Sequence, residues 1–130
     1  MDKVYDILLG NTKIGTTGFE NADPPMGVIL GKISFVNESF DYSFFRDYCV
    51  NNDVRFQEDK ALKLILTNEI LDLHIFDSSG REIKGLAATI SGMDDDEFII
   101  SVEGIPYPFY EQEFPHHVKA YQQRFKTSTN

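Results

Sequence analysis

The chain has 130 residues, 42% of them hydrophobic and 25% charged, which is typical of one folded globular domain rather than a disordered or fibrous chain. Its 21 acidic and 12 basic residues give a net charge of −9, so we expect neither a nucleic acid nor an anionic membrane as partner, because both bind clustered cations. The single cysteine excludes an internal disulfide, and without a signal-peptide core or an apolar run long enough to span a bilayer we expect a cytoplasmic protein.

Three strands are predicted at the start of the chain. Apolar and polar residues alternate in the segments 4–9 and 13–19, which flank the turn sequence GNT, so we expect a β-hairpin. The sequence GVILGKISFV predicts the third strand, with Ile29, Ile33 and Phe35 on one face.

The sequence NADPPMG, which leads into the third strand, predicts a tight corner. Pro24 and Pro25 have a fixed φ angle, and Gly27 allows a backbone conformation that other residues avoid. A phosphate-binding loop would lead into a helix, whereas this glycine leads into a strand. Met26 is expected to be an apolar plug or an exposed contact, and Gly31 a bulge or a point of close approach.

A helix is predicted from Ser39 to Asn52, where the period of the apolar residues changes. Its apolar stripe consists of Phe40, Phe44, Phe45, Tyr48 and Cys49. We expect the aromatic residues of this stripe to pack against the sheet. The cysteine is expected to be buried and unreactive.

A meander of four strands is predicted next, in the segments ALKLILT, LDLHIF, EIKGLAATIS and EFIISVE. A turn with Gly80 at a position of positive φ separates the second of these strands from the third. The acidic run from Asp94 to Glu97 is interpreted as a solvated hairpin tip, because it lacks the ligand spacing of a calcium loop. The residues predicted to face the core are Leu62, Leu64, Leu66, Leu71, Leu73, Ile75, Phe98, Ile100 and Val102.

The last helix is predicted from Pro115 to Phe125, with acidic residues before it and cations at its end. Its apolar stripe consists of Phe114, His117, Val118, Tyr121 and Phe125. The predicted fold is a single α+β domain over residues 1–126, followed by a flexible tail at 127–130. It contains two helices and an antiparallel sheet of about six or seven strands, with a half-open barrel as the main alternative.

Few residues indicate catalysis. His116 and His117 point about 100° apart on a helix and do not chelate one metal ion easily, so we expect His116 to face solvent and His117 to lie at the edge of the core. His74 shares a strand face with Asp72, but no nucleophile at a recognisable spacing accompanies it, which favours a surface pair over proton transfer. The chain contains no P-loop, dinucleotide-binding, nucleophile-elbow or zinc-helix motif, so no cofactor, metal or catalytic residue is predicted.

The segment IPYPFYEQEF is unusually rich in aromatic residues, which alternate with two glutamates. Its prolines favour an extended entry, so the segment is expected to lie across the body, where the rings either cap the open end of the sheet or form an exposed surface with the carboxylates. Exposed tyrosines and carboxylates are typical of surfaces that bind a basic protein. On the second interpretation the partner-binding residues are Asp94, Asp95, Asp96, Tyr110, Glu111 and Glu113.

The segments DPPMGV, ISGMDDDEF and EGIPYPFYEQEFPHHVKAY resemble those of a group of small uncharacterised bacterial proteins, and the resemblance covers nearly the whole chain. In size, charge and lack of a catalytic motif the chain also resembles the small acidic immunity proteins that neutralise contact-delivered toxins. That resemblance implies a non-enzymatic protein-binding module with a basic toxin as partner. The alternative is a small-molecule-binding protein or a hydrolytic enzyme, with a pocket between the sheet and the last helix and His74 or His117 acting with a carboxylate.

Overall fold

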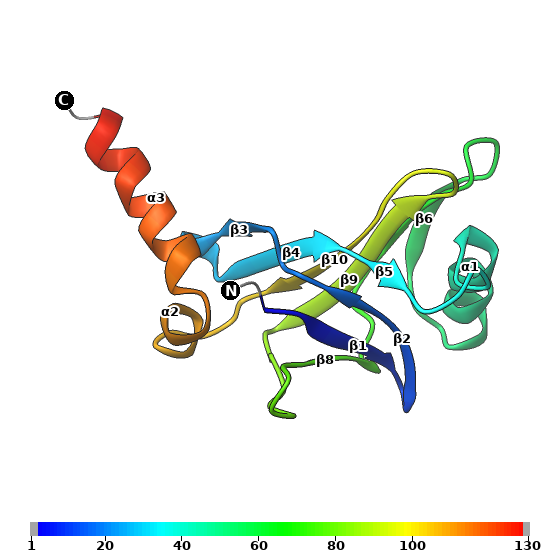
Figure 1. Ribbon diagram of the computed structural model, residues 1–130. Coiled ribbons are helices and arrows are strands. Elements are labelled where there is room, and N and C mark those ends of the chain that lie inside the picture. The colour runs from blue at the N-terminus through cyan, green and yellow to red at the C-terminus, as the bar shows by residue number, and fades with distance from the viewer. Residues whose placement is uncertain (1–2, 129–130) are drawn as a thin grey trace.

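The computed structural model describes residues 3–128, and their side chains as far as Phe125. Within these residues, ten strands form two antiparallel sheets (Figure 1). The four-stranded sheet has the order β5-β2-β1-β8, with bounds Ser34–Phe35, Thr12–Thr17, Tyr5–Leu9 and Leu73–Phe76. The six-stranded sheet has the order β3-β4-β10-β9-β7-β6, with bounds Asn21–Asp23, Val28–Lys32, Phe98–Glu103, Ala87–Met93, Leu64–Thr67 and Phe56–Asp59. The predicted α+β domain with antiparallel strands and a last helix is confirmed, but the described strands form two sheets instead of one and do not close into a barrel.

Within its first 35 residues the chain passes from one sheet to the other at two bends. The predicted third strand bends at Ile33, so that its first part, β4, pairs with β10 and its second part, β5, pairs with β2. The other bend, between β2 and β3, contains Phe19 with a positive φ of 45°. A Cβ atom on Gly31 would come within 2.3 Å of Thr17 Oγ1 and 2.8 Å of the Phe19 backbone, which confirms Gly31 as a point of close approach.

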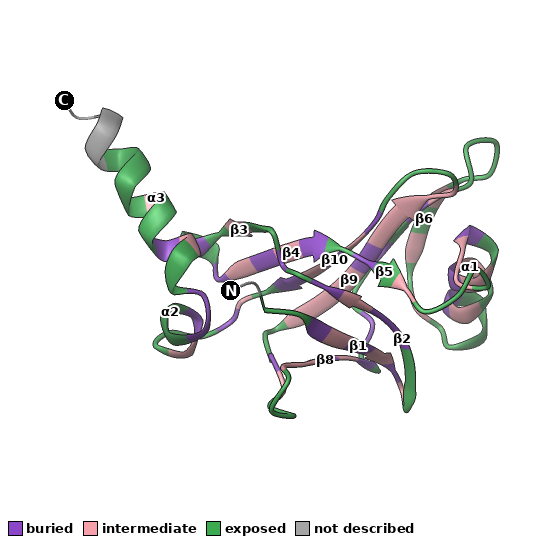
Figure 2. Ribbon diagram, viewed as in Figure 1, coloured by how far each residue is buried: buried purple, intermediate pink, exposed green. Residues whose placement is uncertain are grey.

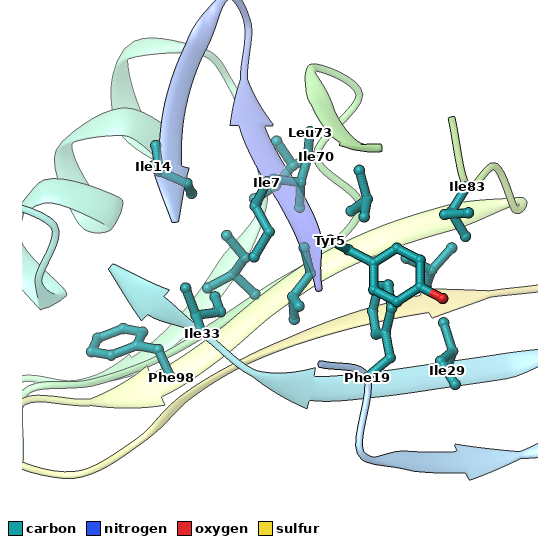
Figure 3. Close-up of a cluster of buried hydrophobic side chains, with 14 of the residues drawn as sticks. Tyr5, Ile7, Ile14, Phe19, Ile29, Ile33, Ile70, Leu73, Ile83 and Phe98 are labelled. Carbon is teal, nitrogen blue, oxygen red and sulfur yellow. The ribbon is translucent and has the colours of Figure 1, made fainter. Parts of the chain in front are cut away.

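A core lies between the sheets and takes residues from both of them. Figure 3 shows Ile33 beside Phe98 in one part of this core and Tyr5 beside Phe19 in another. The ring centroids of Tyr5 and Phe19 are 5.0 Å apart. The inward residues predicted for the third strand and for β10 are confirmed as buried, with Phe35 half-buried: Ile29, Ile33, Phe98, Ile100 and Val102.

The inward face predicted for β7 is wrong, and that predicted for β8 is partly wrong. In β7 the buried apolar residue is Ile65, whereas Leu62 and Leu66 are exposed, because the run LKLIL carries apolar residues on both faces of the strand. In β8 the two predicted residues are buried, but Leu71 lies in a turn before the strand and is exposed. The alternation of apolar and polar residues therefore begins before the first residue of β8.

Helix α1 spans Tyr42–Asn51 and begins later than predicted, because Asp41 caps it. The Asp41 carboxylate accepts a hydrogen bond of 2.9 Å from a backbone N–H of the first turn. The helix lies against β7. Its aromatic residues pack against the core to different extents, with Phe45 buried and Phe44 and Tyr48 half-buried.

The corner predicted before the third strand is confirmed. A one-turn 3-10 helix, η1, spans Pro24–Met26, and Gly27 follows with a φ of +64°. A Cβ atom on Gly27 would come within 2.6 Å of the Ile105 carbonyl oxygen, so the corner packs tightly against the chain after β10. Met26 is exposed, as expected for a contact residue rather than an apolar plug.

The aromatic segment contains a short helix that was not predicted from the sequence. After a cis Tyr107–Pro108 bond, α2 spans Phe109–Glu113, and α3 follows over Pro115–Ser128. Pro108 is the cap residue just before α2, where its missing N–H is not needed, so the prolines are compatible with this helix. The last helix continues beyond the predicted end, and residues 129–130 of the predicted tail lie outside the described residues.

Candidate functional site

The structure separates the six residues that were predicted to bind a partner. Residues 94–96 lie in the turn between β9 and β10, beside α1, whereas residues 110–113 lie on α2 at the other end of the molecule (Figure 1). Asp94 accepts a hydrogen bond of 2.8 Å from the Tyr42 N–H at the start of α1, while the next two aspartates are exposed, as predicted for a hairpin tip. The six residues therefore do not form one surface.

On α2, Tyr110 is buried and Glu111 is exposed. The Tyr110 hydroxyl donates a hydrogen bond of 2.8 Å to the Val28 carbonyl oxygen, and burial raises the pKa of the phenol. Tyr110 therefore caps the core, as the first interpretation of the aromatic segment expects, and is not a surface residue.

The Glu113 carboxylate is 1% exposed and accepts hydrogen bonds from three side chains that are distant in the sequence. The Tyr5 hydroxyl donates at 2.7 Å and Lys3 Nζ at 3.0 Å to one carboxylate oxygen, and the Arg81 guanidinium donates to the other. Burial, and then the hydrogen bond to Glu113, raise the pKa of Tyr5. This network fastens α2 to β1 and to the turn after β8, so the role of Glu113 is structural.

The turn after β8 positions Arg81 for this network. Asp77 accepts hydrogen bonds from Ser79 Oγ at 2.6 Å and from the backbone N–H groups of Ser79 and Arg81, both at 2.9 Å. Gly80 lies between them with a φ of +88°, as predicted. The Ser79 hydroxyl first, and then the backbone N–H groups, hold the pKa of Asp77 at about 2, below its ordinary value of 3.8.

We expect Asp77→Asn to make the protein less sensitive to acid. Because the pKa of Asp77 is lower in the folded chain than in the unfolded chain, its contribution to stability is complete above about pH 5 and is lost as the pH falls towards about 2. The variant should be less stable than the wild type near neutral pH and should lose less of its melting temperature between about pH 5 and pH 2. Thermal denaturation over this range measures the difference, with Asp95→Asn at the exposed hairpin tip as control. Melting temperatures that fall equally with pH in the wild type and in Asp77→Asn would contradict the expectation.

A hollow that the sequence did not predict lies beside β8 and the start of β9. It has a volume of about 190 Å³, and it is lined by Leu71 and Leu86, which are 82% and 81% exposed. These are the largest exposed fractions of any large apolar side chain in the described part of the protein. Buried residues of β8 and β10 also line it: Leu73, Ile75 and Val102. We call this feature the leucine hollow.

Backbone hydrogen bonds hold both leucines in place. The Leu86 N–H donates to the Glu103 carbonyl oxygen at 2.7 Å, and the N–H of Ile70, next to Leu71, donates to the Ala88 carbonyl oxygen at 2.9 Å. The leucines are therefore exposed on an ordered backbone and not on a loosely held loop. Single exposed apolar side chains are common, but these two line one hollow and so offer a partner two apolar contacts at one place.

Carboxylates border the leucine hollow. Glu69 and Glu82 line it, and Glu82 Oε2 lies 2.9 Å from His74 Nδ1. His74 Nε2 lies 3.5 Å from Asp72 Oδ1, so the surface pair predicted for His74 is present, with two carboxylates. Lys84 also lines the hollow, and its ammonium group lies 3.8 Å from the Glu82 carboxylate.

A second groove adjoins the leucine hollow and shares Glu69 and Leu71 with it. This groove has a volume of about 450 Å³ and is also lined by Tyr48, Asp53 and Arg55, near the end of α1. Acidic residues outnumber basic ones in the joint lining of the two depressions: Asp53, Glu69, Asp72 and Glu82 against Arg55 and Lys84. The combined surface is therefore apolar and acidic.

Comparison with known proteins assigns no family to this chain. No family model, no curated protein and no solved structure matches it. Within residues 3–128, no helix combines the length and the apolar character needed to cross a membrane.

A third hollow corresponds to the pocket that was expected between the sheet and the last helix. It has a volume of about 700 Å³, and its lining includes Tyr5, Phe19, Phe114 and His117. His117 Nε2 lies 2.8 Å from the Phe19 carbonyl oxygen, so this nitrogen carries a proton and donates it. His117 thus lies at the edge of the core, as predicted, and fastens α3 to the body.

The residues considered for catalysis lie apart from one another. His74 lines the leucine hollow, and His117 lines the hollow beside α3. Cys49 is buried, as predicted, and burial raises the pKa of its thiol to about 11, so the thiol is protonated at neutral pH. Among the described side chains, no group of three or more His, Cys, Asp or Glu residues could hold a metal ion.

Proposed function

We propose that the chain is an acidic, non-enzymatic protein-binding module, which binds a basic partner protein through the leucine hollow. One observation carries this proposal: the two most exposed large apolar side chains of the described residues line the same hollow, in a chain with a net charge of −9. A partner that covers these leucines removes their apolar surface from water, which contributes to the affinity. The surrounding carboxylates raise the rate of association with a partner of opposite charge.

In its most specific form, the proposal is that the chain is an immunity protein, which neutralises a basic toxin in the cytoplasm. Such a protein needs no catalytic group, since covering a functional surface of the toxin is sufficient. The partner would present an apolar side chain that packs on Leu71 and Leu86 and cations that meet Glu69 and Glu82. The hydrogen-bonded backbone of the hollow supports this role, because an ordered surface loses little conformational entropy on binding.

Capture of partners from an extract of the native host tests the proposal. Three immobilised baits are compared: the wild type, the double variant Leu71→Ser/Leu86→Ser, and Leu62→Ser as control, since Leu62 is exposed in the turn between β6 and β7. We expect a basic protein to be retained in stoichiometric amount by the wild type and the control, and about tenfold or more weakly by the double variant. Equal retention on all three baits would remove the leucine hollow from the proposal.

Association kinetics with the captured protein then test the acidic rim. Glu69→Lys should lower the association rate constant and its dependence on salt, because it replaces a carboxylate that attracts the basic partner. Glu38→Lys, at an exposed position before α1, changes the net charge equally and is the control. Identical rate constants for the two variants would show that the charge next to the hollow has no role in binding.

The hollow beside α3 supports a second candidate, which is the binding of a small molecule. Its volume of about 700 Å³ and its aromatic lining are typical of ligand pockets. A thermal-shift screen tests this candidate, with Gln112→Trp as the variant that partly fills the hollow. A compound that stabilises the wild type but not Gln112→Trp would favour it, and a screen without such a compound would count against it.

A further inference from the structure

The charges of the chain are divided unequally between two parts of the molecule. Residues 1–113 contain all 21 acidic residues and nine of the 12 basic residues. Residues 114–130 contain no acidic residue and three basic ones: Lys119, Arg124 and Lys126. The sheets with α1 and α2 thus form an acidic body, and α3 is a basic helix. The acidic body and the basic helix attract each other. When they do not touch within one copy of the chain, this attraction favours contact between the helix of one copy and the body of another.

Helix α3 leaves the body and projects away from both sheets (Figure 1). Its beginning is anchored, because Val118 is buried and His117 donates a hydrogen bond to the Phe19 carbonyl oxygen. The residues from 119 to 125 are exposed, except for Tyr121, which is half-buried (Figure 2). No described residue of α3 lines the leucine hollow, so within one copy the helix does not cover it.

The projecting part of α3 carries a pair of aromatic side chains. Tyr121 and Phe125 lie one helical turn apart, their ring centroids are 4.8 Å apart, and Phe125 is 55% exposed. The Arg124 guanidinium lies 5.7 Å from the centre of the Tyr121 ring. This face of α3 combines apolar rings with the Arg124 cation, whereas the leucine hollow combines exposed leucines with carboxylates. The two surfaces are therefore complementary in both respects.

We propose that α3 of one copy binds the leucine hollow of a second copy of this chain. The aromatic pair packs on Leu71 and Leu86, and the Arg124 guanidinium meets the carboxylates of Glu69 and Glu82, so that an amphipathic helix lies in an apolar groove. About two helical turns take part, which gives an interface smaller than the roughly 1,200 Å² of a stable complex. The association is therefore weak and depends on concentration.

This inference rests on the proposed function, because both use the leucine hollow as the binding surface. It adds that the chain itself occupies that surface when the partner protein is absent. A basic partner then has to displace α3 of the second copy, so partner binding and self-association exclude each other at the leucine hollow. Because displacing α3 costs free energy, the apparent affinity for the basic partner is lower when this chain is present at high concentration.

Sedimentation equilibrium of the purified chain, with no other protein present, tests the inference over about 1 to 500 μM. We expect the mean mass of the wild type to rise above that of a monomer, and the association to weaken between about 50 and 500 mM salt. Phe125→Ser and Arg124→Glu change exposed side chains, and each should raise the dissociation constant of self-association about tenfold or more. Lys60→Glu, exposed in the turn between β6 and β7, changes the net charge as much as Arg124→Glu does and should have no effect.

A charge exchange identifies the two surfaces. Arg124→Glu and Glu69→Lys should each weaken self-association, but an equimolar mixture of the two variants should associate again, because opposite charges then face each other across the contact. A wild type that remains monomeric throughout the range, or equal association of the wild type, Phe125→Ser and Arg124→Glu, would overturn the inference.

The outcomes separate this inference from the proposed function. A monomeric wild type that captures a basic protein through Leu71 and Leu86 overturns the self-association alone. A chain that associates through α3 but captures no basic protein supports the self-association and counts against the proposed function.

Discussion

Phe45→Ala is expected to lower the free energy of unfolding by about 3 to 5 kcal/mol, because it leaves a cavity in the core. Phe45 is fully buried, and its ring centroid lies 5.8 Å from that of Phe35 and 5.6 Å from that of Phe98. Since Phe35 belongs to β5 and Phe98 to β10, this ring joins α1 to both sheets. The surrounding side chains come from three elements and cannot easily collapse into the space.

Denaturation by urea measures this loss, with Val50→Ala as control in the same helix. Val50 is exposed, so its truncation should change the unfolding free energy by no more than about 0.5 kcal/mol. A loss below about 1 kcal/mol for Phe45→Ala would mean that the apolar face of α1 is not part of the cooperative core.

Glu113→Ala is expected to cost about 2 to 4 kcal/mol of unfolding free energy. The variant leaves the buried Tyr5 hydroxyl without its acceptor and removes the anion between Lys3 and Arg81. Because these two cations are 59% and 53% exposed, water compensates part of the lost attraction, which keeps the effect below that of a fully buried ion pair. Differential scanning calorimetry near neutral pH measures the change.

The matched control for this variant is Glu111→Ala, on the same short helix. Glu111 is exposed, and its removal should change the stability by no more than about 0.5 kcal/mol. Equal and small losses for the two variants would show that the buried network of Glu113 does not hold α2 to the body.

Much of the fold could be predicted because the patterns of its elements are local. The hairpin of β1 and β2, the helix α1 and the inward face of β10 follow from alternation or from helical spacing. The division into two sheets could not be predicted, because the bends at Phe19 and Ile33 depend on contacts between distant segments, such as the approach of Gly31 to Thr17. The inward face of β7 was ambiguous, since its three consecutive apolar residues occupy both faces.

The candidate site was harder to predict, because burial decides which side chains a partner can reach. Glu111 and Glu113 are alike in charge and close in the sequence, yet only Glu113 lies in the core. Leu71 continues the alternation of β8 and was therefore predicted to face inwards, but a turn places it outside the strand. No local pattern marks Leu86, whose backbone is held by Glu103 on β10.

The tight fit at Gly31 has a consequence for the evolution of this fold. Any side chain at this position would meet the Phe19 backbone, which cannot move without disturbing the pairing of β2 or β3. Surface charges and turn sequences are free of this restriction and can diverge much faster. We therefore expect distant relatives to keep Gly27 and Gly31, one at the left-handed corner and one at the crossing of the sheets, after most other identities have been lost. Such relatives can then be recognised by two glycines at this spacing at the start of an alternating apolar segment.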